Sequence, residues 1–327
     1  MSPWPRRLGA VALVGILVTV IGLWLGGPGK LGESMVDSTD RASAPGPDRA
    51  EARSARKQRD RLNPRARAIA LEPVASKIPV RHDFDRPPQA GVMFDVDSGE
   101  VLWERHLGRE APIASLTKMM TAHLIAKRHA SDERVRIPKE AVGVGGSMVG
   151  LLPAGKKVPL GALLKGLLLA SGNDAAVALA DDDAGSVPNF VDRMNAEAKR
   201  LGLSCSEFST PHGLEDRGNY SCPRDLAAIA RLLLGDPRLA KIMGSSSAKV
   251  DFPIPGGTLE LANNNPFIRA GDKSVTGVKT GFTEAAGRCY VMAAKRGGRH
   301  LGVVLLDSPD PLKQVSKLWQ LGFEARG

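Results

Sequence analysis

Aromatic residues make up only 4% of this 327-residue chain, and no RNA- or DNA-reading motif accompanies them. The formal net charge of +10 would otherwise favour nucleic acid as a partner. However, the segment 41–81 holds eleven lysine and arginine residues against four acidic ones, so most of the excess lies in one apolar-poor stretch. We therefore expect no nucleic-acid partner.

Cysteine and histidine are also scarce. The three cysteines, Cys205, Cys222 and Cys289, match no metal-binding spacing, and the six histidines include no His-Glu-x-x-His motif. We interpret these residues as packing or surface side chains and expect no metal site. A disulfide between Cys205 and Cys222 is compatible with an oxidising compartment, but the sequence does not decide the pairing.

Charged residues are absent from Leu8 to Leu25, which as a helix would span about 27 Å, close to the hydrocarbon core of a bilayer. Arg6 and Arg7 precede this segment, which predicts a cytoplasmic N-terminus and export of the chain beyond residue 25. The run is long for a signal peptide, and no Ala-x-Ala-like cleavage site comes after it. We expect residues 1–27 to be a retained membrane anchor, with a cleaved signal segment as the alternative.

Residues 28–87 are rich in proline, arginine, serine and alanine and show little apolar periodicity. Such a composition buries too little apolar surface to offset the entropy that is lost on ordering. We predict a disordered basic linker, in which a short helix within 53–71 is the one element that the pattern allows. The folded domain is then expected at 88–327, with no second domain after it.

Within that domain the pattern is strands first, helices in the middle and strands last. It predicts an α+β fold, in which one sheet is built from both ends of the domain and helices pack on it. The expected strands are Ala90–Val96, Glu100–Arg105, Val250–Ile254, Thr258–Leu261, Val275–Gly281, Cys289–Ala294 and Leu301–Leu306. The expected helices are one that begins at Pro112 and those over Val158–Ala170, Asp174–Asp182, Pro188–Leu201, Pro223–Leu234 and Pro311–Leu321.

The helix expected from Pro112 carries a serine and a lysine on one face. Ser115 and Lys118 are three residues apart, which places their Cβ atoms about 5–6 Å from each other. A hydroxyl beside an amine is the minimum for a nucleophile with its own base. The helix N-terminus adds free N–H groups and a partial positive charge where an oxyanion would form. Alone, Ser-x-x-Lys is a weak signal, because most such quartets are solvated helix faces.

Two further motifs come later in the chain, Ser171-Gly172-Asn173 in a loop between helices and Lys279-Thr280-Gly281 in a strand. Each is weak by itself, since Ser-Gly-Asn is most often a turn and Lys-Thr-Gly a strand end. Together with Ser-x-x-Lys, in this order, they form the signature of penicillin-binding proteins and class A β-lactamases. The combined signal is therefore strong.

The chain resembles the low-molecular-mass penicillin-binding proteins of the D-alanyl-D-alanine carboxypeptidase type (peptidase family S11). This resemblance implies a serine β-lactamase/penicillin-binding-protein-like fold, a mostly antiparallel sheet flanked by helices with a helical subdomain. It runs from about Ala90 to Phe323. Its further matches are Pro112–Ala122, Leu168–Ala176, Met194-Asn195, Leu201–Leu203, Pro211–Leu214, Asp225–Ala227, Asn263–Asn265, Gly277–Thr283 and Ala286-Gly287.

The resemblance also implies the catalytic roles. Ser115 would be the acyl nucleophile, and Lys118 would take its proton, provided that burial and the nearby cation Lys279 keep Lys118 neutral. A solvent-exposed lysine near its reference pKa of about 10.4 could not do this, so the site must be enclosed. Ser171 would pass a proton to the departing D-alanine amine. No metal or organic cofactor is needed for this chemistry.

Substrate-binding roles are implied by the same resemblance. Asn173 would hold the peptide carbonyl, and Lys279 with Thr280 would bind the terminal carboxylate. Gly281 would let substrate approach the strand backbone closely. The N–H groups of Ser115 and Phe282 would form the oxyanion hole, a feature typically worth a factor of about 10²–10³ per donor.

The activity implied by the resemblance is removal of the terminal D-alanine of peptidoglycan stem pentapeptides, with β-lactams as inhibitors. The catalytic domain would lie outside the cytoplasmic membrane of a bacterial cell envelope, reached through the N-terminal helix. The alternatives are a D,D-endopeptidase that cuts cross-links, a serine β-lactamase and a non-catalytic wall-binding module. Gly172 stands where class A β-lactamases use Asp, and no Glu-x-x-x-Asn loop is evident, which disfavours the β-lactamase. The full set of catalytic side chains disfavours the binding module.

Two departures from the family bear on fine substrate preference. Asn264 stands where several relatives carry a basic or larger side chain near the substrate carboxylate, and Glu324 lies near a position where some relatives have arginine. The sequence also stops where relatives continue into a small β-rich domain and a C-terminal amphipathic helix.

Overall fold

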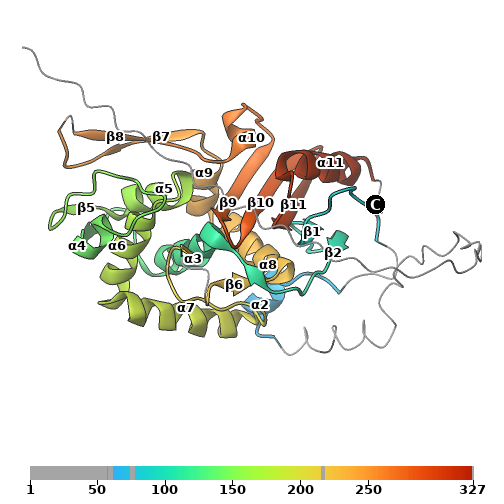
Figure 1. Ribbon diagram of the computed structural model, residues 1–327, viewed down its shortest axis with the longest axis horizontal. Coiled ribbons are helices and arrows are strands. Elements are labelled where there is room, and N and C mark those ends of the chain that lie inside the picture. The colour runs from blue at the N-terminus through green and yellow to red at the C-terminus, as the bar shows by residue number, and fades with distance from the viewer. Residues whose placement is uncertain (1–56, 58–61, 74–77, 215–217, 256, 326–327) are drawn as a thin grey trace, which may run out of the picture. The chain divides into compact units, whose positions relative to one another are not determined.

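Both ends of the folded chain meet in a five-stranded antiparallel sheet (Figure 1). The computed structural model describes residue 57 and residues 62–73, 78–214, 218–255 and 257–325. Strand order in the sheet is β2-β1-β11-β10-β9, which places β9 at one edge. The strands are β1 (Ala90–Asp95), β2 (Val101–Arg105), β9 (Val275–Thr283), β10 (Gly287–Arg296) and β11 (Arg299–Leu306).

The two faces of this sheet are covered by different helices. Helix α11 (Pro311–Glu324) packs on one face, and α8 (Pro223–Leu234) packs on the other. Because side chains alternate along a strand, neighbouring residues enter different cores. Met93, Met292, Val303, Leu305, Leu318 and Trp319 share the core under α11. Val92, Phe94, Val291, Val304, Leu306 and Leu226 belong to the larger core under α8.

The middle of the chain is helical, as the sequence predicts, and lies beside β9 and α8 (Figure 1). Three two-stranded pieces, β3 with β6, β4 with β5, and β7 with β8, are separate from the five-stranded sheet. The helices are α3 (Lys118–Arg128), α4 (Lys139–Val142), α5 (Leu160–Leu169), α6 (Asn173–Ala184), α7 (Val187–Leu201), α9 (Pro237–Met243) and α10 (Pro266–Arg269). The short strands are β3 (Ala111–Pro112), β4 (Arg134–Arg136), β5 (Lys157–Pro159), β6 (Tyr220–Ser221), β7 (Ser247–Asp251) and β8 (Thr258–Ala262). The α+β class is confirmed.

Local capping explains why helix α7 begins and ends where it does. The Ser186 hydroxyl accepts a hydrogen bond from the N–H of Asn189, and Pro188 occupies the first turn, where its missing N–H costs nothing. At the other end Gly202 adopts φ 72°, the left-handed conformation that closes many helices. The sequence therefore contains both boundaries, and the predicted range Pro188–Leu201 differs by one residue.

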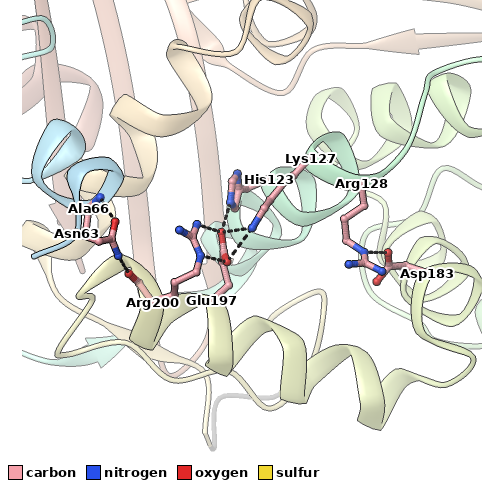
Figure 2. Close-up of polar contacts among 8 residues, drawn as sticks. All are labelled: Asn63, Ala66, His123, Lys127, Arg128, Asp183, Glu197 and Arg200. Carbon is pink, nitrogen blue, oxygen red and sulfur yellow. Dashed lines mark hydrogen bonds and ion pairs between the residues drawn. The ribbon is translucent and has the colours of Figure 1, made fainter.

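Polar contacts join α3 to α7 (Figure 2). The buried carboxylate of Glu197 on α7 lies 2.7 Å from His123 Nε2 and 3.1 Å from Lys127 Nζ, both on α3, and it also accepts from Arg200 at 2.6 Å. With so many donors, the pKa of Glu197 is held far below its usual range. These contacts fix α3, the helix next to Ser115, against α7.

Part of the expected linker packs against the domain. Helix α2 (Pro64–Ile69) is capped by Asn63, whose side-chain amide also donates to the carbonyl of Arg200 at 2.6 Å (Figure 2). The buried apolar side chains of this segment are Ala66, Ile69, Leu71 and Val80. Order therefore begins before residue 88, where composition alone placed the start of the folded domain, because these few apolar residues find partners on the domain. Residues 28–56 and 58–61 of the expected linker lie outside the described residues.

Among the described residues, the structure contains no helix with the length and apolar character that crossing a membrane requires. The segment 8–25, and with it the expected anchor at 1–27, lies outside the described residues.

Candidate active site

The sheet edge β9 lies directly against the turn that carries Ser115. This turn is a 3₁₀ helix, η1 (Ala114–Thr117), and α3 starts only at Lys118, so the prediction of a helix from Pro112 is corrected. Ala114 adopts φ 48°, a sparsely populated conformation for a residue with a side chain. A Cβ atom added at Gly281 would lie 3.1 Å from Ser115 N and 3.0 Å from Ile113 O. Glycine at this position therefore allows the strand to approach the serine backbone.

Ser115 and Lys118 meet as the spacing predicts. Lys118 is fully buried, and its Nζ lies 2.8 Å from Ser115 Oγ and 2.7 Å from the carbonyl oxygen of His212. The rest of the helix face is apolar, with Leu116, Met119 and Met120 all in the core. The amine is therefore removed from water and directed at the hydroxyl.

A second lysine–serine pair comes from the other two motifs. Lys279 on β9 is 2% exposed, and its Nζ donates to Ser171 Oγ at 2.9 Å and to the carbonyl oxygen of Thr280 at 2.7 Å. Ser171 precedes α6 and has φ 62°, again a strained conformation for a side-chain-bearing residue. The structure thus brings together Ser115, Lys118, Ser171 and Lys279, which lie far apart in the sequence.

The pKa values of Lys118 and Lys279 are both lowered, but the surroundings that lower them differ. Burial has the largest effect on Lys118 and lowers its pKa well below the ordinary value, and the positive charge of Lys279 lowers it further. The carboxylate of Asp174 acts in the opposite direction and offsets part of this lowering. Burial lowers the pKa of Lys279 to about 7. These shifts favour the neutral amine at Lys118, and they leave Lys279 titrating near neutral pH.

The loop before α6 is fixed by the residue next to the Ser-Gly-Asn motif. Asp174 is fully buried, and its carboxylate accepts hydrogen bonds from the N–H groups of Val149 at 2.8 Å and Gly150 at 2.9 Å. Asn173, 2% exposed, donates from its side chain to the carbonyl oxygen of Gly145 at 2.9 Å. The irregular glycine-rich stretch between Val142 and Leu152 is thus held against the motif.

Gly172 is required by the close approach of this loop. A Cβ atom there would lie 2.5 Å from Val149 Cγ2 and 2.7 Å from an Asp174 carboxylate oxygen. The Asp that class A β-lactamases use at this position would not fit without moving the loop. This contact gives a physical reason for the sequence-based argument against a β-lactamase.

An open cleft of about 470 Å³ lies in front of these residues. Ser115, Ser171, Thr280, Gly281 and Phe282 are among the predicted residues that line it, and the Phe282 side chain is 61% exposed. Lys118, Asn173 and Lys279 lie behind them as buried partners. The predicted set therefore forms one site.

Some of the residues that line the cleft belong to no motif in the sequence. Arg288 and Tyr290 on β10 lie opposite Phe282 and Thr280 of β9, so cross-strand pairing brings them to the same cleft. Ser147 lines it from the glycine-rich loop. Asn264, which belongs to the matched stretch Asn263–Asn265 and differs there from several relatives, lines it after β8. Arg288 and Tyr290 could have been found only from their pairing with the strand that carries the Lys-Thr-Gly motif. That pairing is known only once the order and register of the strands in the sheet are known.

His212 is a further buried neighbour of the site. Its carbonyl oxygen receives the Lys118 hydrogen bond, and its Nδ1 accepts the N–H of Leu214 at 3.0 Å. Burial, together with the nearby Lys118, lowers the pKa of His212 to about 4, so the ring is neutral at physiological pH. The Pro-His-Gly-Leu match in the sequence marks this loop without indicating the contact.

One group of described residues, Cys205, Cys222 and Asp225, brings potential metal ligands together. The two cysteines form a disulfide, which settles the pairing that the sequence left open. The Asp225 carboxylate already accepts from the N–H of Cys205 and the hydroxyl of Ser206, both at 2.9 Å. Because a disulfide offers no thiolates to a metal, this group has a structural role.

A buried amine that contacts a serine hydroxyl beside an open cleft is the arrangement that acyl transfer to a serine requires. Comparison with known proteins makes this chemistry specific. The sequence profile of the family described as D-alanyl-D-alanine carboxypeptidase matches residues 81–310. The chain belongs to this peptidase family, which confirms the expectation from the three motifs.

Curated relatives bear the same description. D-alanyl-D-alanine carboxypeptidase DacF of Bacillus subtilis is 34% identical over 245 residues, which cover 72% of this chain and 62% of the relative. DacB2 of Mycobacterium tuberculosis is 34% identical over 247 residues, 73% of this chain and 83% of the relative. This chain spans only about three fifths of the length of several curated relatives that it matches.

Solved structures agree with the fold. A D-alanyl-D-alanine carboxypeptidase from Mycobacterium tuberculosis superposes with a TM-score of 0.70 at 31% identity, covering 75% of this chain and 94% of that one. A Streptomyces DD-transpeptidase gives a TM-score of 0.68 at 29% identity, covering 74% and 99%. The penicillin-binding-protein-like fold predicted from the sequence is therefore confirmed.

Proposed function

We propose that this chain is a serine D-alanyl-D-alanine carboxypeptidase that removes the terminal D-alanine of peptidoglycan stem pentapeptides through an acyl-enzyme on Ser115. The observation that carries the proposal is the fully buried Lys118 amine, 2.8 Å from the Ser115 hydroxyl. In a solvent-exposed serine–lysine pair the lysine would be protonated at neutral pH and could not act as a base. Membership of the carboxypeptidase family supports the choice of substrate.

Acylation begins when substrate lies along β9. The terminal carboxylate is held by the Lys279 ammonium and the Thr280 hydroxyl, and Asn173 holds the peptide carbonyl. Ser115 Oγ attacks the carbonyl carbon of the scissile bond while its proton moves to the neutral Lys118 amine. Backbone N–H groups of Ser115 and Phe282 stabilise the resulting oxyanion.

Collapse of the tetrahedral intermediate breaks the carbon–nitrogen bond. Ser171, which lies 2.9 Å from the Lys279 ammonium, delivers a proton to the departing amine, and D-alanine leaves. The proton that Lys118 took from Ser115 replaces the one that Ser171 gave up, so Lys118 is again a neutral amine. Water then attacks the ester and gives up a proton, which restores the Ser115 hydroxyl and releases the shortened peptide. A β-lactam ring would be opened by the same attack and would remain bound as an ester.

The place of action that we propose is outside the cytoplasmic membrane, where peptidoglycan lies. The Cys205–Cys222 disulfide supports it, because such bonds persist in oxidising compartments. We also propose that residues 1–27 anchor the chain in the membrane. Fractionation of full-length chain and of chain lacking residues 1–27 tests the anchor, and equal release of both into the soluble fraction would contradict it.

The test of the activity uses Ser115→Ala. We expect loss of both D-alanine release from a pentapeptide and covalent labelling by a fluorescent penicillin. Ser316→Ala, an exposed serine on α11, is the matched control and should behave as the wild type. Retained labelling of Ser115→Ala would show that the nucleophile is elsewhere.

A second activity, transfer of the acyl group to an amine, is favoured by the likeness to the Streptomyces DD-transpeptidase. An endopeptidase that cuts cross-links would use the same residues on a larger leaving group. Product analysis on cross-linked and uncross-linked muropeptides separates the three reactions. We expect D-alanine and tetrapeptide as the main products.

A further inference from the structure

A second, basic groove of about 520 Å³ lies between α5, α9 and β7. Its lining includes four cationic side chains, Lys165 of α5, Arg238 and Lys241 of α9, and Lys249 of β7. Asp251 is the one carboxylate among the described residues that line it. We call these four cations and their surroundings the basic groove.

Three of the four cations have no acidic partner within the described residues. Lys165, Lys241 and Lys249 form no ion pair there, whereas Arg238 lies 3.8 Å from Asp236 and donates to backbone carbonyls at the end of α3. Like charges gathered around one concave surface raise the local positive potential. The basic groove is therefore suited to a ligand with more than one anionic group.

The basic groove and the catalytic cleft share a wall. Leu169 at the end of α5 lines the groove, and Ser171, two residues later, lines the cleft. Asn264 also lines the cleft and binds this wall, because its N–H and side-chain amide donate to the carbonyl oxygens of Leu169 and Ala170 at 2.9 and 3.1 Å. A polymer that enters the cleft can therefore reach the groove around the end of α5.

We propose that the basic groove binds carboxylates of a second stem peptide on the same peptidoglycan strand whose first stem peptide lies in the catalytic cleft. This inference rests on the proposed function, in which the substrate is a polymer that carries peptide carboxylates at regular intervals. The groove then adds affinity for polymeric substrate and leaves the chemistry on a short peptide unchanged. It makes the enzyme selective for assembled wall over free peptide.

The test removes the three unpaired charges in full-length chain as Lys165→Gln/Lys241→Gln/Lys249→Gln. A short synthetic peptide ending in D-Ala-D-Ala and purified peptidoglycan freed of phosphodiester polymers are the two substrates. We expect kcat/KM on the short peptide and the rate of penicillin acylation to stay within about twofold. On peptidoglycan we expect kcat/KM to fall about tenfold, through KM, since each surface ion pair is worth roughly a factor of two to three.

The matched control is Lys199→Gln/Lys273→Gln/Lys295→Gln, which removes the same charge from exposed lysines of α7, the turn before β9, and β10. It should leave both substrates unchanged. Salt at about 0.5 M should bring wild type down to the groove variant on peptidoglycan, because exposed charges are screened. An equal loss on both substrates, or no loss on peptidoglycan, would overturn the proposal. So would a loss seen only when phosphodiester polymers are left on the wall.

A binding experiment separates this inference from the proposed function. Ser115→Ala, which should not turn over, is sedimented with peptidoglycan in the presence and absence of the three groove substitutions. Weaker sedimentation of the groove variant supports the basic groove even where wild-type chain releases no D-alanine. Equal sedimentation counts against it even where the carboxypeptidase activity is present.

Discussion

Two lysines in one enclosed site have different tasks, although burial lowers the pKa of both. Lys118 must accept a proton, whereas Lys279 must stay positive to hold a carboxylate. The positive charge of Lys279 adds to the effect of burial on Lys118, and the pKa of Lys279 stays near 7. Acid–base chemistry near neutral pH requires that Lys118 lose its proton at a lower pH than Lys279.

This order predicts a bell-shaped pH dependence for acylation by penicillin. The second-order rate should rise as pH passes upward through the pKa of Lys118, because only the neutral amine can take the Ser115 proton. It should fall again as pH passes upward through about 7, because free enzyme then loses the Lys279 charge that binds the penicillin carboxylate. Stopped-flow acylation across the acid, neutral and alkaline ranges measures both limbs. A rate that still climbs well above neutral pH would contradict this assignment.

The carboxylate of Asp174 acts on the pKa of Lys118 in the direction opposite to Lys279, so its removal tests the role of Lys118 independently. Its charge raises the pKa of Lys118, so Asp174→Asn should lower that pKa and move the acid limb of the profile to lower pH. The amide also places an NH₂ group against the N–H of Gly150, which should cost about 1.5–3 kcal/mol in unfolding free energy. Asp192→Asn, an exposed residue of α7, is the control and should change neither quantity. An acid limb that moves upward would refute this role for Asp174.

At the scale of elements, the site depends on how closely the β9 edge approaches the η1 turn. The contact around Gly281 involves backbone atoms of Ile113 and Ser115, which cannot rotate away as a side-chain end could. Because the oxyanion donors proposed here lie one on each element, their separation is set by this contact. A small change there should affect catalysis more than stability.

Gly281→Ala tests the contact. The added methyl would lie 3.0–3.2 Å from atoms of residues 113–115, so β9 has to shift by a few tenths of an ångström. We expect the penicillin acylation rate to fall about 10- to 100-fold, given how steeply rates depend on reactant geometry. Gly143→Ala, where nothing lies within 4 Å, is the control that keeps the rate. Wild-type acylation by Gly281→Ala would show that the close approach is not needed.

The sequence predicts more about elements than about their contacts. Helix α8 is predicted over its full length, since Pro223 and Gly235 mark its ends. The Ser115 turn is expected as α-helix because apolar spacing continues through it, and periodicity does not distinguish a 3₁₀ turn from the helix beside it. Strand β7 begins at Ser247, three residues before the expected strand, because its exposed residues show no apolar alternation.

The sequence predicts which motif residues form the site, but it does not predict most of the other residues that surround them. Short motifs carry chemistry that is readable one residue at a time, which is why Ser115, Lys118 and Lys279 can be assigned from the sequence alone. Arg288 and Tyr290 reach the cleft only through the pairing of β10 with β9, and no local pattern encodes that register. The Asp174 contacts with Val149 and Gly150 likewise join segments 25 and 24 residues apart.

At the scale of the whole molecule, the stable domain begins earlier than its composition indicates. Residues 62–87 contribute the buried side chains Ala66, Ile69, Leu71 and Val80. Chain that begins at residue 62 should unfold at the same urea concentration as full-length chain. Chain that begins at residue 89 should lose about 2–4 kcal/mol, since burying an aliphatic side chain is worth about 1.5–3 kcal/mol before the entropy of ordering is subtracted. A start at residue 78 keeps Val80 and serves as the intermediate control. Equal stability of all the chains would mean that this segment lies on the domain without stabilising it.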